Sequence, residues 1–173
     1  MIPKRAKREA LKVKFIDLHC DTISEIYKRR RKGETYCLLE NGGHVDLKRL
    51  KEGGCLAQSF ALFTRLKDEE DPLKYARNLL SVFREEVEKN REVISQVTSV
   101  DEILENERKG RMSAVLTVED GGVFQGRIQY LEEFWRQGLK MVTLTWNYPN
   151  ELGYPNLINW KTGKCRPETE RGL

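Results

Sequence analysis

The stretch VKFIDLHCD, residues 13–21, is an apolar run that ends in a polar cluster. The run predicts a β-strand, in which side chains two residues apart point to the same side. His19 and Asp21 are therefore expected side by side at the strand's end, where an imidazole nitrogen and a carboxylate oxygen suit a divalent cation such as zinc. Cys20 should point to the opposite face and pack. The structural alternative is a hydrogen-bonded histidine in a turn, followed by an aspartate that caps the next helix.

The composition describes one polar domain that is large enough for a real core. The chain has 173 residues, with 31 Lys and Arg against 27 Asp and Glu and a formal net charge of +4. The excess charge lies in a basic arm, residues 1–12, and in the run 28–32. Aromatic residues do not interleave with either segment apart from Tyr27, so nucleic acid is not expected as a partner.

Membrane insertion and secretion are not expected either. No stretch approaches the roughly 20 apolar residues that cross a bilayer, and the N-terminus lacks the apolar core of a secretory signal. The four cysteines are widely spaced and form no C-x-x-C pair. Reduced thiols in the cytoplasm are the resulting prediction.

Strand and helix patterns alternate along the chain. The uninterrupted apolar runs 55–63 and 113–118 are typical of parallel strands that are covered on both faces. A fourth strand is expected at 141–145, which makes the order β-α-β-α-β-α-β. Capping residues, helical spacing and terminal glycines predict the helices 22–32, 46–52, 72–87, 100–109 and 128–137.

This order fits either an open doubly wound sheet or a (β/α) barrel. No glycine-rich nucleotide loop follows any strand, whereas polar residues gather at the strand ends, which favours the barrel. The domains expected are the basic arm 1–12 and a partial (β/α) barrel, 13–173. Its last part, residues 147–173, is rich in Asn, Pro and Gly and predicts a long loop, either functional or a tail that lacks its partner.

Four ordered blocks resemble the membrane dipeptidase (renal dipeptidase) family of zinc peptidases. The blocks are IDLHCDT at 16–22, HVDL at 44–47 with GG at 53–54 and AQSFA at 57–61, LTVEDG at 116–121, and TLTWN at 143–147. The resemblance implies the N-terminal half of a (β/α)8 TIM-type barrel with about four parallel strands. It also implies a binuclear zinc centre that hydrolyses dipeptides, including those with a C-terminal D-residue. Amidohydrolases share an H-x-H or H-x-D pair on the first strand, but the glutamate on the third strand favours the dipeptidase.

The resemblance implies roles for particular residues. In the family the H-x-D pair binds one zinc and the glutamate that ends the third strand bridges both, which here are His19, Asp21 and Glu119. Glu119 is thus a ligand and a catalytic residue, with a surface glutamate in a turn as the alternative. Trp146 stands where mammalian members carry a substrate-binding histidine, so Trp146 and Asn147 are implied to bind the dipeptide. Core packing at the strand end is the alternative for Trp146.

The histidine count departs from the family pattern. The second zinc needs two more histidines from later strands, but this sequence contains only His19 and His44. His44 is predicted to be structural, holding the turn 42–43 before Asp46. We therefore expect a fragment truncated after its fourth strand and inactive alone, whose partner is a second copy or a complementary C-terminal half. The alternative is a non-catalytic half-barrel that self-associates or pairs with such a chain.

Overall fold

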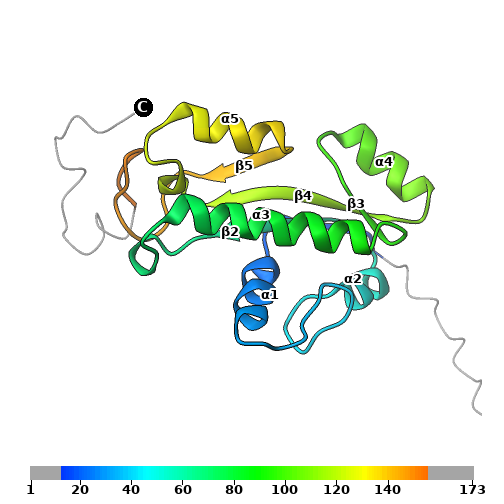
Figure 1. Cartoon of the computed structure of the whole chain (residues 1–173). Coiled ribbons are helices and arrows are strands. Elements are labelled where there is room, and N and C mark those ends of the chain that lie inside the picture. The colour runs from blue at the N-terminus through cyan, green and yellow to red at the C-terminus, as the bar shows by residue number, and fades with distance from the viewer. Residues whose placement is uncertain (1–12, 156–173) are drawn as a thin grey trace, which may run out of the picture.

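The computed structural model describes residues 13–155, and the predictions for the basic arm and for the tail beyond residue 155 lie outside this range. Five parallel strands and interleaved helices form one α/β sheet structure (Figure 1). The strands are β1 (Phe15–Asp17), β2 (Cys55–Phe63), β3 (Ile94–Gln96), β4 (Met112–Glu119) and β5 (Leu139–Thr143). The helices are α1 (Thr22–Arg31), α2 (Leu47–Gly53), α3 (Pro72–Lys89), α4 (Val100–Arg108) and α5 (Ile128–Arg136). Two 3-10 turns, η1 (Leu66–Asp68) and η2 (Gly121–Phe124), complete the described elements.

The four predicted strands are present, and a short fifth strand accompanies them. β2 lies between β1 and β4, and every pairing in the sheet is parallel. β3 and β5 share the other edge of β4, because β3 pairs with residues 112–114 and β5 with residues 116–119. β3 is therefore an accessory strand at the amino end of β4, and β5 begins two residues before its predicted start.

Local signals set the helix boundaries. The side chain of Asp71 accepts a hydrogen bond from the Lys74 amide at 2.9 Å, and Pro72 is the first residue of α3. The predicted capping box of α4 forms in full, with Ser99 and Glu102 each bonded to the other's backbone amide. α2 ends where Gly54 takes a left-handed conformation with φ 86°, which a residue with a side chain rarely adopts.

One face of the sheet packs against helices and forms the core. Phe60 of β2 contacts Phe83 of α3, with ring centroids 6.0 Å apart. α3 runs along the sheet in front of β2 and β4 in Figure 1, and α5 lies above β5. The larger side chains that are wholly or almost wholly buried belong to this core: Ile23, Ile26, Leu38, Leu47, Leu62, Leu79, Ile94, Leu116 and Phe134.

The opposite face of the central strands carries mostly small and polar side chains, with Phe63 at its carboxyl end. Register pairs Ala61 with Thr117 and Phe63 with Glu119, so these four residues share one face. Glu119 is the last residue of β4, at the carboxyl end of the sheet. The fold therefore brings a carboxylate to the same edge at which β1 and β2 end. Within residues 13–155, no helix is both long enough and apolar enough to cross a lipid bilayer.

Candidate metal centre

The segment that follows β1 is held against β2. The Cys20 amide donates to the Ser59 carbonyl at 3.0 Å, and the Ala61 amide donates to the Cys20 carbonyl at 2.9 Å. Between these two bonds the Cys20 side chain packs into the core, as predicted, and burial raises the pKa of its thiol to about 11. His19 and Asp21 are thereby fixed on either side of Cys20, at the carboxyl end of β2.

Asp21 occupies the N-cap position of α1 without acting as a cap. Its side chain makes no capping hydrogen bond to the helix, although aspartate at this position usually does. The carboxylate turns instead toward His19, and 56% of the Asp21 side chain is exposed. The interpretation of Asp21 as a helix cap is therefore wrong, and its oxygens are available to a ligand.

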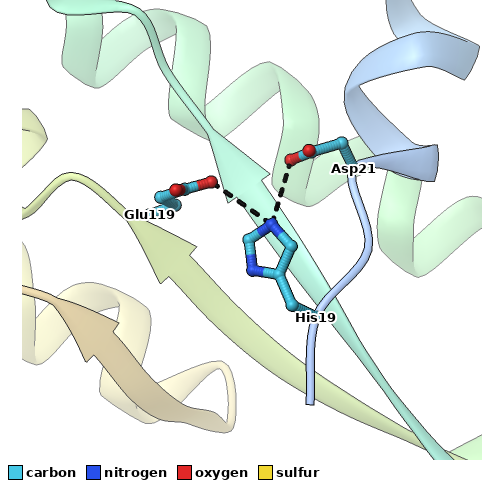
Figure 2. Close-up of side chains that lie close together, drawn as sticks. All are labelled: His19, Asp21 and Glu119. Carbon is cyan, nitrogen blue, oxygen red and sulfur yellow. Dashed lines mark ion pairs between the residues drawn. The ribbon is translucent and has the colours of Figure 1, made fainter. Parts of the chain in front are cut away.

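Figure 2 shows the imidazole of His19 between two carboxylates, one from the segment after β1 and one from β4. The His19 Nε2 atom lies 3.5 Å from Asp21 Oδ1 and 3.4 Å from Glu119 Oε2. Donor atoms of all three residues lie within 4.8 Å of one another. One imidazole nitrogen and two carboxylate oxygens that converge in this way are a donor set suited to zinc or a similar divalent cation.

The environment of the Glu119 carboxyl also favours a bound cation. Only 16% of its side chain is exposed, against 47% for His19. Burial raises the pKa of the Glu119 carboxyl, His19 opposes this shift, and the nearby carboxylates Asp21 and Asp120 add to it. Because a largely buried carboxyl beside two like charges is costly to ionise, a cation placed among these side chains would relieve that cost. Glu119 is thus no ordinary surface glutamate in a turn.

Two residues that the sequence analysis did not single out support the end of β4. Asp120 has a φ of 79° and accepts hydrogen bonds from the Gly122 amide at 3.1 Å and from Asn150 Nδ2 at 2.8 Å. Asn150 also donates to the Leu144 carbonyl at 2.7 Å, so it ties the loop after β5 to the turn after Glu119. A Cβ at Gly121 would lie 2.5 Å from Leu152 Cδ1 and 3.2 Å from the Leu144 carbonyl oxygen, so a larger residue there would force Leu152 to move.

Trp146 lies beside the metal-ligand candidates but outside their cluster. Its ring is 4.9 Å from that of Phe63, the residue that pairs with Glu119 in the sheet. The Tyr148 ring also contacts the indole, with ring centroids 5.8 Å apart. Trp146 therefore packs at the strand ends while standing next to the candidate centre. Asn147 follows it in the chain, is partly buried, and does not join the three-residue cluster.

His44 does not hold the turn that precedes Asp46. Asn41 does so, because its Nδ2 donates to the carbonyls of Cys37 and Val45 at 3.1 and 3.0 Å. The Asn41 side-chain oxygen also accepts from the Gly43 amide at 2.9 Å. The predicted structural role of His44 is therefore wrong: its side chain is exposed, and it lines the cavity that His19 and Asp21 also line.

The fold and the converging donors define a chain of the partial TIM-barrel class with a candidate metal site at its strand ends. A sequence model of the membrane dipeptidase family (peptidase family M19) matches residues 4–161, and the chain belongs to this family. An uncharacterized protein of Acinetobacter calcoaceticus from the PQQ-III 3′ region is 22% identical over 93% of this chain and 56% of its own length.

Solved structures share the fold. The dipeptidase AC, a metallopeptidase, superposes with a TM-score of 0.74 at 21% identity over 83% of this chain and 46% of its own. A metallopeptidase from Rhodobacter sphaeroides, solved with a phosphinate mimic of the dipeptide L-Ala-D-Ala, gives 0.70 at 19% identity over 80% and 47%. The parallel sheet therefore corresponds to part of a TIM-like barrel. The chain spans about half the length of these relatives.

Proposed function

We propose that this chain carries the N-terminal half of the active site of a zinc-dependent dipeptidase. The observation that supports the proposal is the convergence of His19, Asp21 and Glu119 from two strand ends that are far apart in the sequence. They meet at the carboxyl edge of the sheet, where barrel enzymes carry out their chemistry. Membership of the membrane dipeptidase family supplies the reaction class, hydrolysis by a metallopeptidase.

In this proposal His19 and Asp21 are terminal ligands of one zinc, and Glu119 is the bridging and catalytic carboxylate of a two-zinc centre. Bound divalent cations would lower the pKa of a water and polarise the peptide carbonyl. Glu119 suits the bridge because it offers two oxygens and its burial favours a compensating positive charge. Beyond Glu119, residues 13–155 offer no donor set for the second zinc, because His44, the other histidine of the sequence, is not part of the three-residue cluster.

The proposed substrate is a dipeptide, with Trp146 and Asn147 contacting it. Trp146 is supported by its ring contact with Phe63, the sheet neighbour of Glu119. The Rhodobacter sphaeroides neighbour was solved with a mimic of L-Ala-D-Ala, which suggests a D-residue on the C-terminal side.

A cytoplasmic location is proposed too, because each cysteine of residues 13–155 is a free thiol.

The isolated chain should bind zinc but hydrolyse little, because it supplies three ligands of a larger set. Isothermal titration calorimetry with zinc, and hydrolysis of L-Ala-D-Ala with added zinc, test this expectation. We expect one loosely held cation for each chain and little or no turnover. Failure to bind zinc would remove the basis of the proposal. Turnover that disappears in Glu119→Gln would show that the half-site is active without a partner.

The second candidate function is a non-catalytic half-barrel that pairs with itself or with a complementary chain. Exposed apolar side chains on the outer strands, and just after β1, favour it, with exposed fractions of 50% for Ile16, 65% for Leu18 and 40% for Met141. Unpaired strand edges of this kind invite further pairing. Sedimentation velocity should then show a dimer, or a complex with the complementary half. A monomer that stays soluble across the micromolar range would count against self-association.

A further inference from the structure

A cavity of about 640 Å³ opens beside the candidate metal ligands. Its near wall contains His19 and Asp21, and its far wall is formed by helix α1 and the loop 36–45. A peptide bond positioned at the three-residue cluster would therefore have one of its flanking side chains at the mouth of this cavity. The volume lies within the range of roughly 300–1,000 Å³ that is typical of small-molecule sites.

The far wall is preformed. Arg30 Nε donates to the Tyr36 carbonyl at 3.0 Å, and the Leu38 amide donates to Glu86 Oε2 at 2.6 Å. Asn41 closes the same loop on itself through the bonds described above. A loop that is tied at both ends and in its middle keeps its shape without a ligand, so little ordering entropy is lost when a side chain enters.

The charges on this wall favour a cation. Arg29 donates from Nε to Glu25 at 2.6 Å and from Nη1 to Glu34 at 2.8 Å, and its guanidinium lies 4.9 Å from the centre of the Tyr36 ring. The one guanidinium is therefore occupied by two carboxylates and is poorly placed to bind an anion. Glu34 does not line the cavity itself but pairs with Arg29 behind it, so the group Glu25, Arg29 and Glu34 has a formal net charge of −1, and Asp21 adds a further carboxylate to the near wall. His44 adds an exposed imidazole to the same wall.

We propose that this cavity is the subsite for one side chain of the dipeptide and that it prefers a basic side chain to an acidic one. Glu25 supplies the charge, and a ring nitrogen of His44 offers a hydrogen-bond acceptor to an ammonium or guanidinium group. The proposal rests on the proposed function, because the three-residue cluster must place the peptide bond at the mouth of the cavity.

Gly42 offers a way to fill the cavity without disturbing the backbone. It lines the cavity, and a Cβ added there would meet no heavy atom within 4 Å. Gly42→Leu therefore adds bulk at the wall at little cost to folding. Gly153→Leu is the matched control, since a Cβ at Gly153 also meets nothing within 4 Å and the residue is not part of the cavity wall.

The test is the affinity of the zinc-loaded chain for Lys-Ala, Glu-Ala, Ala-Lys and Ala-Glu, measured by ligand-observed NMR. In one of the two pairs we expect the lysine dipeptide to bind about tenfold more tightly than its glutamate counterpart, because attraction replaces repulsion. Gly42→Leu should reduce lysine-dipeptide binding about tenfold, and Gly153→Leu should not. Glu25→Gln should bring the lysine and glutamate affinities closer together.

The outcomes distinguish a failure of the cavity proposal from a failure of the proposed function. Equal affinity for lysine and glutamate dipeptides in both pairs, or a lysine preference that survives in Gly42→Leu, would overturn the cavity proposal alone. Loss of zinc binding by the parent chain, or zinc binding without affinity for any dipeptide, would count against the proposed function as well. Circular dichroism of each variant shows whether its fold is retained.

Discussion

Replacing Glu119 with glutamine is expected to weaken zinc binding at least about 100-fold. Loss of a residue that merely supports a metal ligand already costs roughly 10- to 100-fold in affinity, and Glu119 is proposed to be a ligand itself. Glutamine keeps the size of the side chain but removes its negative charge and one anionic oxygen. Competition with a chromogenic chelator, followed by absorbance, measures the change over the required range.

The matched control is Glu132→Gln. Glu132 is an exposed glutamate of α5 whose carboxylate pairs with Arg136 at 2.9 Å, away from the candidate centre. Zinc affinity should be unchanged in this variant. If Glu119→Gln bound zinc as the parent chain does, the three-residue cluster would not be the zinc site.

In the metal-free protein, by contrast, Glu119→Gln should increase the stability of the fold. Because the folded-state pKa of the Glu119 carboxyl is raised, its ionisation is harder in the folded chain than in the unfolded one. The parent chain therefore loses stability as the pH rises from the unfolded pKa through the folded pKa. With EDTA present at pH 7, Glu119→Gln should need more urea to unfold than the parent, and this difference should fade below about pH 4.

The fold was predictable to the extent that its signals are local. The uninterrupted apolar run of β2 and the capping box of α4 each lie within a few residues and gave correct elements. β3 was missed because its three residues, Ile94–Gln96, contain a single apolar side chain and so form no apolar run. Its role, sharing the edge of β4 with β5, depends on pairing between distant segments.

In the candidate site, too, local signals were predictable from the sequence and contacts between distant segments were not. His19 and Asp21 could be named from their two-residue spacing after an apolar run, whereas the role of Glu119 followed from the family resemblance. Whether Asp21 caps α1 or faces His19 depends on how β1 docks on β2, which the sequence alone leaves open. The role of Asn41 in place of His44 was equally hidden, because either side chain can hydrogen-bond a turn and only the folded loop distinguishes them.

Glu86→Ala is expected to destabilise the chain by about 3–5 kcal/mol, because it leaves a largely buried charge without its partner. The Glu86 side chain is fully buried; one of its oxygens pairs with Arg30 and the other accepts from the Leu38 amide. Without the carboxylate, the Arg30 guanidinium and the Leu38 amide both lose this acceptor. Loss of the carboxylate also frees the loop that forms the far wall of the cavity. Urea unfolding followed by circular dichroism measures the loss of stability.

Glu85→Ala is the control for this prediction, since Glu85 neighbours Glu86 and also approaches Arg30, at 3.4 Å. Its side chain is 47% exposed and pairs with Lys89 at the surface, so its loss should cost no more than about 1 kcal/mol. Glu86→Gln should fall between the two alanine variants, because an amide oxygen still accepts from Leu38 but carries no charge for Arg30. Equal losses in Glu85→Ala and Glu86→Ala would mean that the surface charge matters as much as the buried one. The loop would then be fixed by Asn41 and its own packing.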